Sequence, residues 1–169
     1  FGDGLVAHVG FADPFCPALS RDLYRAAQSS SAIVHKGGAM VVMEGPLFST
    51  RAESLLYRSW GASIIGMTAL PEAKLAREAE ICYVTLACVT DYDCWHEGHD
   101  DVTIEMVVAN LLRNVEASKS ILRSLVANLR TDRRCACATS LQNAIVTDRG
   151  LIPTEVRDRL SLLIGKYVQ

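Results

Sequence analysis

The chain has 169 residues, half of them hydrophobic, and a formal net charge of −2 at pH 7. This length fits one domain with a substantial buried core, and the composition excludes a disordered chain. The balanced charge, with Arg133-Arg134 as only a short basic patch, argues against nucleic-acid binding. The longest apolar run covers residues 81–89 and has the length of a strand, so the sequence predicts no membrane span.

Strand-like and helix-like patterns alternate along the chain. Strands are predicted over residues 5–9, 40–44, 63–68 and 81–89. Helices are predicted over residues 17–29, 50–60, 72–80, 103–129, 138–146 and 153–167. Thr50 and Glu53 have the spacing of a capping box at the start of the second helix. The alternation predicts an α/β fold whose sheet is covered by helices on both faces.

Two carboxylates, Asp91 and Asp93, follow the strand predicted over residues 81–89. Ligand sites of α/β sheets open at the ends of strands. Alternation along an extended segment would point both side chains to the same side. There they suit a ligand that carries a proton-accepting ring nitrogen and an amino group. A solvated strand end and a divalent-metal site are the alternative interpretations of this pair.

Six cysteines raise the question of disulfides and metal sites. Three of them, Cys82, Cys88 and Cys94, lie within or just beyond the predicted strand, where we expect them to act as small apolar residues. A disulfide between Cys135 and Cys137 would be strained, and the sequence shows no second pair that completes a zinc site. We therefore expect free thiols in a reducing cytoplasm, with a redox or stabilising role as the alternative.

Three motifs occur in a fixed order: residues 44–53 (Glu-Gly-Pro-Leu-Phe-Ser-Thr-Arg-Ala-Glu), residues 66–72 (Gly-Met-Thr-Ala-Leu-Pro-Glu) and residues 90–95 (Thr-Asp-Tyr-Asp-Cys-Trp). Their order and spacing resemble the C-terminal part of the 5′-methylthioadenosine phosphorylases, within the trimeric purine nucleoside phosphorylase family. The resemblance extends from about His8 to Val108. It implies a homotrimer and a phosphorylase/hydrolase-like α/β domain with a mixed central sheet flanked by helices. Residues 1–169 would be the C-terminal part of that single domain.

The resemblance also implies a reaction. Inorganic phosphate would cleave the N-glycosidic bond of 5′-methylthioadenosine and release adenine and 5-methylthioribose 1-phosphate, in purine and methionine salvage. Phosphate is then a co-substrate, and neither a cofactor nor a metal is implied. Negative charge develops on the departing purine, so a hydrogen bond or proton is needed at N7. Asp91 would supply it, and Asp93 would accept a hydrogen bond from the 6-amino group.

Further residues receive roles from the same resemblance. Phe48 would stack on the purine and ribose, Met67 would lie against the ribose, and Thr68 would contact phosphate. His8 would reach the 5′ end of a substrate bound in the adjacent subunit. The pocket for the 5′ substituent would be lined by apolar residues of the helix predicted over 103–129, whose spacing equally suits packing on the sheet: Ile104, Val107 and Val108.

Three positions indicate the substrate preference within the family. Members that act on inosine and guanosine carry Asn at the position of Asp91, Glu at that of Ser49, and His near that of Val107. An ionised Asp accepts from the 6-amino group of adenine and repels a 6-oxo group. An apolar Val suits a methylthio group better than a 5′-hydroxyl. The favoured substrate is therefore a 6-aminopurine nucleoside with a 5′-thioether.

Part of the family pattern is missing. Its phosphate-binding loop, Arg and His belong to an N-terminal half that these residues do not contain, so we expect an N-terminal part of the same enzyme as a partner. Two alternatives stay open: a related phosphorylase for adenosine, inosine or 5′-methylthioinosine, and a non-catalytic half that binds nucleoside. The metal-capable run of residues 96–101 is predicted to hold no metal, because Asp100 and Asp101 suit the start of the next helix.

Overall fold

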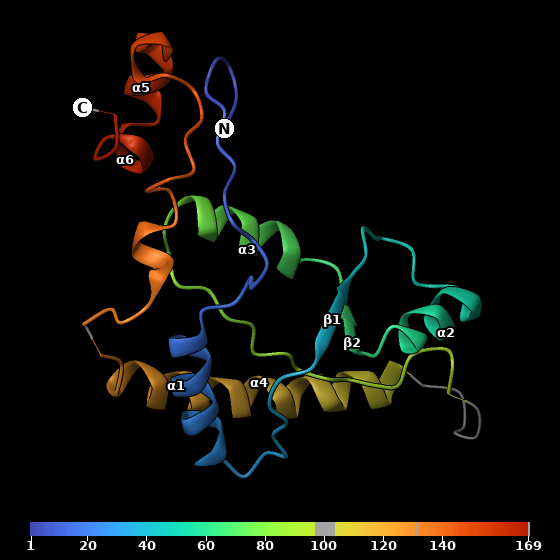
Figure 1. Ribbon diagram of the computed structural model, residues 1–169. Helices are drawn as coiled ribbons and strands as arrows, with labels where there is room; N and C mark the ends of the chain where they lie inside the picture. The colour runs from blue at the N-terminus through green and yellow to red at the C-terminus, as the bar shows by residue number, and fades with distance from the viewer. Residues whose placement is uncertain (97–103, 131, 169) are drawn as a thin grey trace. The chain divides into compact units, whose positions relative to one another are not determined.

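The computed structural model describes residues 1–96, 104–130 and 132–168, which form two compact units (Figure 1). The first unit comprises Phe1–Ser20, Pro71–Val84 and Thr131–Gln169, and the second comprises Arg21–Leu70 and Thr85–Arg130. No described helix is both long enough and apolar enough to cross a membrane.

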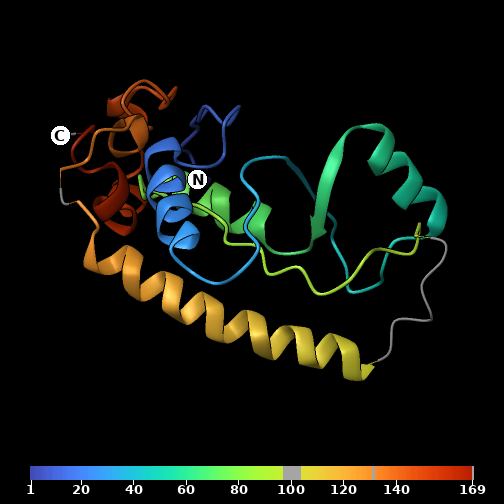
Figure 2. The ribbon, with the colours of Figure 1, turned by 90° about the horizontal axis from the view of Figure 1, so that it is seen from below.

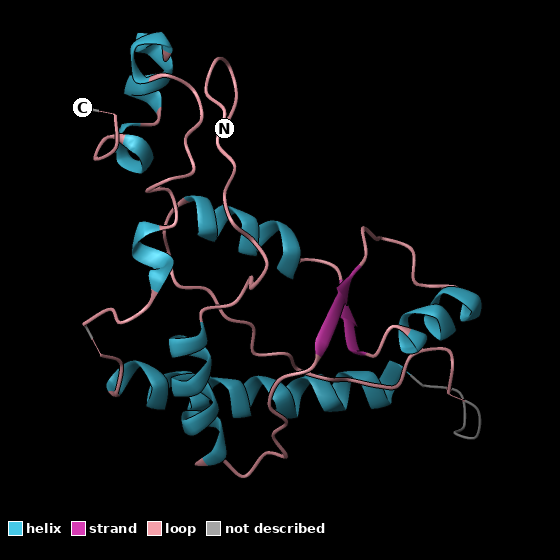
Figure 3. Ribbon diagram, in the orientation of Figure 1, coloured by secondary structure: helices cyan, strands magenta, loops and turns pink. Residues whose placement is uncertain are grey.

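The second unit contains a pair of parallel strands, β1 (Ala39–Val42) and β2 (Ala62–Gly66), seen in magenta in Figure 3. Helix α2 (Arg51–Ser59) connects them and lies against β2, which makes a βαβ unit. Both strands lie within the ranges predicted from the sequence, apart from one residue at each N-terminal end. The predicted α/β class is confirmed.

The predicted capping box at the start of α2 is confirmed. The backbone N–H of Glu53 donates to the Thr50 hydroxyl at 3.3 Å, and the backbone N–H of Thr50 donates to the Glu53 carboxylate at 2.7 Å. Hydrogen bonds from the Thr50 backbone and hydroxyl lower the pKa of Glu53. The box fixes where the helix begins and therefore how the loop before it is anchored.

Two further helices of the second unit match their predictions closely. Helix α1 (Pro17–Gln28), which begins in the first unit, and helix α4 (Ile104–Ala127) both bury apolar side chains. The buried residues are Leu23, Ala26 and Ala27 of α1 and Ile121 and Leu125 of α4. The N-terminal half of α4 behaves differently, because its apolar row stays exposed: Ile104, Val108, Leu111, Leu112 and Val115. The alternative that this row packs on the sheet is not borne out within the described chain.

The strand predicted over residues 81–89 is wrong for the described chain. The segment has no regular structure, and Ile81 and Val89 are exposed. Its part in the second unit, residues 85–89, runs alongside α4 in both views (Figures 1 and 2). Neither described strand pairs with it, because β1 and β2 pair only with each other. A run of apolar, β-branched residues forms a strand only where a neighbouring strand satisfies its backbone.

The first unit is built from short elements around one small core. They are α3 (Ala69–Glu78), the 3-10 turns η1 (Ala136–Thr139) and η2 (Arg149–Leu151), α5 (Thr154–Arg159) and α6 (Ser161–Ile164). The core consists of Leu5, Leu141, Ala144, Ile152, Val156, Ile164 and Val168. The strand predicted over residues 5–9 is reduced to a single antiparallel bridge between Ala7 and Ile145.

Two predicted helices of the first unit are wrong in extent. Residues 138–146 form only the end of η1 and a series of turns, and residues 153–167 divide into α5 and α6 at Leu160. In residues 138–146 a side chain accepts a backbone hydrogen bond that a helix would otherwise use. Glu80, which is 8% exposed, accepts a hydrogen bond from the Leu141 backbone N–H at 3.0 Å. This tertiary hydrogen bond thus outweighs the local helix propensity of residues 138–146.

Candidate active site

The carboxyl ends of β1 and β2 lie at one edge of the two-stranded sheet, because the strands are parallel. The Met43 backbone N–H donates to the Gly66 carbonyl at 2.9 Å and continues the pairing one step beyond β1. The chain after β1 carries Phe48, and the chain after β2 carries Met67 and Thr68. Three of the predicted site residues therefore follow neighbouring strand ends, where ligand sites of α/β proteins open.

A close approach at Gly45 joins these two loops. The backbone of Gly45 has φ +68°, and a Cβ atom there would lie 2.6 Å from Sδ of Met67. The position therefore requires glycine both for its conformation and for the space beside Met67. Phe48 stands three residues further along, 85% exposed, with its ring available to a flat ligand.

Asp93 is held by helix α2. The Ser54 hydroxyl, 1% exposed, donates to Oδ2 of Asp93 at 2.5 Å, and the Cys94 backbone N–H donates to Oδ1 at 2.8 Å. The Cys94 thiol also donates to the Ser49 carbonyl at 3.5 Å. The second predicted carboxylate thus lies beside the Phe48 loop. Ser54 was not identified from the sequence, and its only signal is a small polar residue on an amphipathic helix next to the motif.

Asp91 is more exposed than Asp93 and accepts a hydrogen bond from its neighbour Thr90 at 2.6 Å. Helix α4 fixes the backbone before it. The Asn110 amide donates to the Thr90 carbonyl at 2.6 Å, and the Asn114 amide donates to the Val89 carbonyl at 2.8 Å. A polar stripe of α4 thereby satisfies backbone groups that a neighbouring strand would otherwise pair. The sequence did not predict this stripe, because the periodic signal of the helix comes from its apolar row.

Aromatic side chains surround the end of the carboxylate segment. The rings of Tyr92 and His96 stack with centroids 4.5 Å apart, and Trp95 meets the edge of both. The Arg58 guanidinium of α2 lies 3.4 Å from the centre of the Trp95 ring, a cation–π contact. His96 is thus accounted for by ring packing. The rest of the metal-capable run and the predicted cap at Asp100 and Asp101 lie outside the described residues.

The other predicted residues occupy two places. Ile104, Val107 and Val108 lie in the first turns of α4, with Ile104 79% exposed and Val107 half-buried. They precede Asn110, whose amide binds Thr90, so the helix turn next to Asp91 carries them. His8 belongs to the first unit, where its backbone N–H donates to the Ala144 carbonyl at 2.8 Å and its side chain is exposed.

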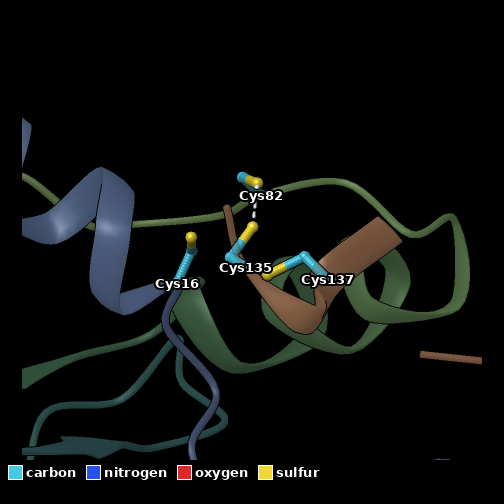
Figure 4. Close-up of side chains that lie close together, drawn as sticks. All are labelled: Cys16, Cys82, Cys135 and Cys137. Atoms are coloured by element: carbon cyan, nitrogen blue, oxygen red, sulfur yellow. Dashed lines mark hydrogen bonds between the residues drawn. The ribbon is translucent and has the colours of Figure 1, made fainter. Parts of the chain in front are cut away.

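The cysteines differ from the expectation. Cys88 and Cys94 are exposed and Cys82 is half-buried, so none of the three acts as a fully buried apolar residue. Contrary to the sequence-based expectation, a second pair of cysteines, Cys16 and Cys82, lies beside Cys135 and Cys137. The sulfur atoms of Cys16, Cys82, Cys135 and Cys137 all lie within 4.8 Å of one another in the first unit (Figure 4). The spacing along the chain hides this cluster, because Cys16 and Cys82 belong to distant segments.

Comparison with known proteins identifies the family. Residues 1–127 match the phosphorylase superfamily. The chain belongs to the phosphorylase superfamily. It is 58% identical over 168 residues to the S-methyl-5′-thioadenosine phosphorylase of Geobacter sulfurreducens, a match that covers 99% of this chain and 59% of the relative. For the S-methyl-5′-thioadenosine phosphorylase of Koribacter versatilis the identity is 53%, with 99% of this chain and 57% of the relative covered. The chain thus spans under three fifths of the length of these relatives.

Solved structures of this superfamily show the same fold. A methylthioadenosine phosphorylase from an Antarctic soil metagenomic library superimposes with a TM-score of 0.89 at 43% identity, over 96% of this chain and 58% of the other. The methylthioadenosine phosphorylase of Schistosoma mansoni, solved with adenine, superimposes with a TM-score of 0.67 at 33% identity. That match covers 76% of this chain and 51% of the other.

Proposed function

We propose that this superfamily member is the C-terminal part of a phosphate-dependent 5′-methylthioadenosine phosphorylase, folded as one domain with the N-terminal part of the same enzyme. The supporting observation is the meeting of the Phe48 loop, Met67 and the Asp93 segment at one strand edge, through the Gly45–Met67 and Ser54–Asp93 contacts. The relatives that match 99% of this chain carry the name of this activity.

The reaction replaces one bond at the anomeric carbon with another. A phosphate oxygen attacks C1′ of the ribose while the C1′–N9 bond breaks, and the bonding electrons leave with adenine. Asp91, an exposed carboxylate, hydrogen-bonds to or protonates N7 and so stabilises the charge that develops on the base. Thr68, at the end of β2, contacts the phosphate. Inorganic phosphate is the co-substrate, and the step needs no cofactor.

The base is recognised by its amino group and its face. Asp93 keeps free acceptor capacity on both carboxylate oxygens after its bonds from Ser54 and Cys94, so it accepts from the 6-amino group. Phe48 stacks on the purine and ribose, and Met67 lies against the ribose. A 6-oxo purine would bring an acceptor against the same carboxylates and is disfavoured.

The 5′ end of the substrate lies against the first turns of α4 in this proposal. Ile104, Val107 and Val108 offer an apolar wall to the methylthio group. His8 of an adjacent subunit completes the pocket, which requires a homotrimer of complete subunits. The exposed side chains of Leu111, Leu112 and Val115 in α4, and the exposed Ile81 and Val89, are the surfaces that we assign to the N-terminal part of the enzyme. A cytoplasmic location stays a prediction.

Adenosine is a second candidate substrate, and one observation favours it. A structural neighbour is described as an adenosine/methylthioadenosine phosphorylase of Schistosoma mansoni. Its match to this chain has a TM-score of 0.69 at 33% identity. Both substrates present the same 6-amino group to Asp93, so only the 5′ side separates them. Inosine and 5′-methylthioinosine lack that 6-amino group and are therefore weaker candidates. The non-catalytic alternative is a half that binds nucleoside without turnover.

A chimera tests the proposal. The part of the Geobacter sulfurreducens relative that this chain does not match is fused ahead of Phe1, and the relative itself is the positive control. We expect release of adenine from 5′-methylthioadenosine, with kcat/KM higher than for adenosine and far higher than for inosine. A chimera that folds and assembles as the relative does, but releases no adenine, would contradict the proposal.

A further inference from the structure

We infer that Cys16, Cys82, Cys135 and Cys137 form a closed tetrathiolate site for a zinc ion in the first unit. The four sulfur atoms lie within 4.8 Å of one another and come from three separate segments of the chain. Figure 4 shows Cys16 ahead of α1, Cys82 on the segment after α3, and Cys135 and Cys137 at η1. This inference does not rest on the proposed function.

The spacing of the sulfur atoms fits a shared central ion. Zinc–sulfur bonds of about 2.3 Å place tetrahedral sulfur ligands about 3.8 Å apart. Here the Cys82 and Cys135 sulfurs lie 3.3 Å apart, and no separation within the set exceeds 4.8 Å. Shifts of an ångström or less would therefore complete the tetrahedron. All four cysteines are free, so all four sulfur atoms are available as ligands.

Two hydrogen-bond donors lie beside sulfur atoms of the cluster. The Arg133 guanidinium donates to the Cys82 sulfur at 3.6 Å and to the Glu80 carbonyl at 2.6 Å, which fixes it over the cluster. The Leu19 backbone N–H, in the first turn of α1, donates to the Cys16 sulfur at 3.5 Å. Four thiolates around one zinc ion carry two net negative charges, so a fixed cation and a helix N-terminus beside them are favourable.

The backbone around the cluster is already in place. The Cys16 backbone N–H donates to the Tyr83 carbonyl at 2.8 Å, which ties the segment before α1 to that of Cys82. The Ser140 hydroxyl donates to the Arg77 carbonyl at 2.7 Å, which ties η1 to α3. Cys16 and Cys137 are buried, and Cys82 and Cys135 are half-buried. Four protein ligands leave no open position, so the ion is structural and takes no part in catalysis.

Metal titration of the full chain, purified with reductant and treated with a chelator, tests this inference. We expect about one zinc ion per chain and a zinc-dependent rise of the thermal midpoint by several degrees. Cobalt as a spectroscopic probe should give thiolate charge-transfer absorption and the strong visible bands of a tetrahedral ion. Less than half an equivalent of zinc at saturation, or cobalt spectra without thiolate bands, would overturn the inference.

Three variants separate a built site from scattered thiols. Cys82→Ser removes a half-buried ligand and should lower zinc affinity by about 100-fold or more, whereas Cys88→Ser removes an exposed thiol of the second unit and should leave it unchanged. Arg133→Gln keeps all four ligands and should lower the affinity by about 10-fold. Equal effects of the two cysteine variants, or isolation of the cluster as disulfides that bind no zinc after reduction, would exclude the site.

Discussion

The buried hydroxyl of Ser54 in α2 donates a hydrogen bond to Oδ2 of Asp93 at 2.5 Å, across 39 positions of sequence. This bond ties the helix between the two strands to the segment that carries both candidate carboxylates. It limits the rotation of the Asp93 side chain and leaves its remaining lone pairs for a donor from the ligand. A side chain that is already oriented pays less entropy when the base binds.

Loss of the Ser54 hydroxyl should therefore weaken binding more than turnover. For Ser54→Ala we expect KM for 5′-methylthioadenosine to rise about 10-fold with a small change in kcat, and stability to fall by about 1 kcal/mol. Steady-state kinetics and urea unfolding measure the two effects. Ser59→Ala is the matched control, because this exposed serine of α2 donates only to the Leu56 carbonyl. Equal KM values for the two variants would show that Ser54 does not position Asp93.

Replacing the exposed carboxylate of Asp91 tests base recognition. Asp91→Asn should lower kcat/KM for 5′-methylthioadenosine by about 10²- to 10⁴-fold, because the amide cannot protonate N7. Residual activity should move toward 6-oxo purines, to which an amide can donate. The ratio of kcat/KM for 5′-methylthioadenosine and 5′-methylthioinosine measures the shift. Asp158→Asn, an exposed carboxylate of α5, should change neither value, and full activity of Asp91→Asn would refute the assigned role.

A pair of glycine variants separates backbone strain from the contact with Met67. Gly45 and Gly37 have φ +68° and +78°, but only Gly45 would place a Cβ against another side chain. Each change to alanine should cost about 1–2 kcal/mol of stability from the left-handed backbone alone. Gly45→Ala should in addition displace the Phe48 loop and lower kcat/KM, which Gly37→Ala should leave intact. Similar kcat/KM for both variants would show that the contact with Met67 does not position the loop.

Sequence patterns predicted the elements whose determinants are local. The Thr50–Glu53 capping box, the proline in the first turn of α1 and the periodicity of α4 act over a few residues, and each element is present. The carboxylate motif at residues 90–95 contacts the Phe48 loop through Cys94 and Ser49, and the roles of its residues stay predictions. Short-range signals of this kind survive because no distant partner has to be known.

The errors arose where a distant partner decides the conformation. Residues 81–89 were predicted to form a strand, but a strand needs a neighbouring strand. The Asn114 side chain of α4 binds the Val89 carbonyl instead. Residues 138–146 read as a helix, but Glu80 takes the N–H of Leu141. The four-cysteine cluster escaped notice for the same reason, because Cys16 and Cys82 approach Cys135 only in the folded chain.

Glu80 should be a main determinant of the stability of the first unit. It has φ +55° and accepts from the Leu141 N–H, the Tyr167 hydroxyl and the Lys166 ammonium. Burial raises the pKa of Glu80, but hydrogen bonds from Lys166, Tyr167 and Leu141 outweigh it and leave the pKa lowered. Glu80→Ala removes this acceptor and should lower the free energy of unfolding by about 3 kcal/mol, because three donors lose their shared partner.

Urea unfolding measures this loss. Glu80→Gln keeps an acceptor oxygen and should lie between the wild type and Glu80→Ala, whereas Glu155→Ala, at an exposed position of α5, should cost only a few tenths of a kcal/mol. A loss below about 1 kcal/mol for Glu80→Ala would show that the three hydrogen bonds do not hold the unit together.

The most direct test of the central claim is the release of adenine from 5′-methylthioadenosine by the chimera, measured with and without inorganic phosphate. We predict release that depends on phosphate and yields one 5-methylthioribose 1-phosphate for each adenine, and that falls by about 10²-fold or more in Asp91→Asn. Release at the same rate without phosphate would contradict the phosphorylase reaction. No release from an assembled chimera, while the Geobacter sulfurreducens relative is active, would show that these residues do not form a catalytic site.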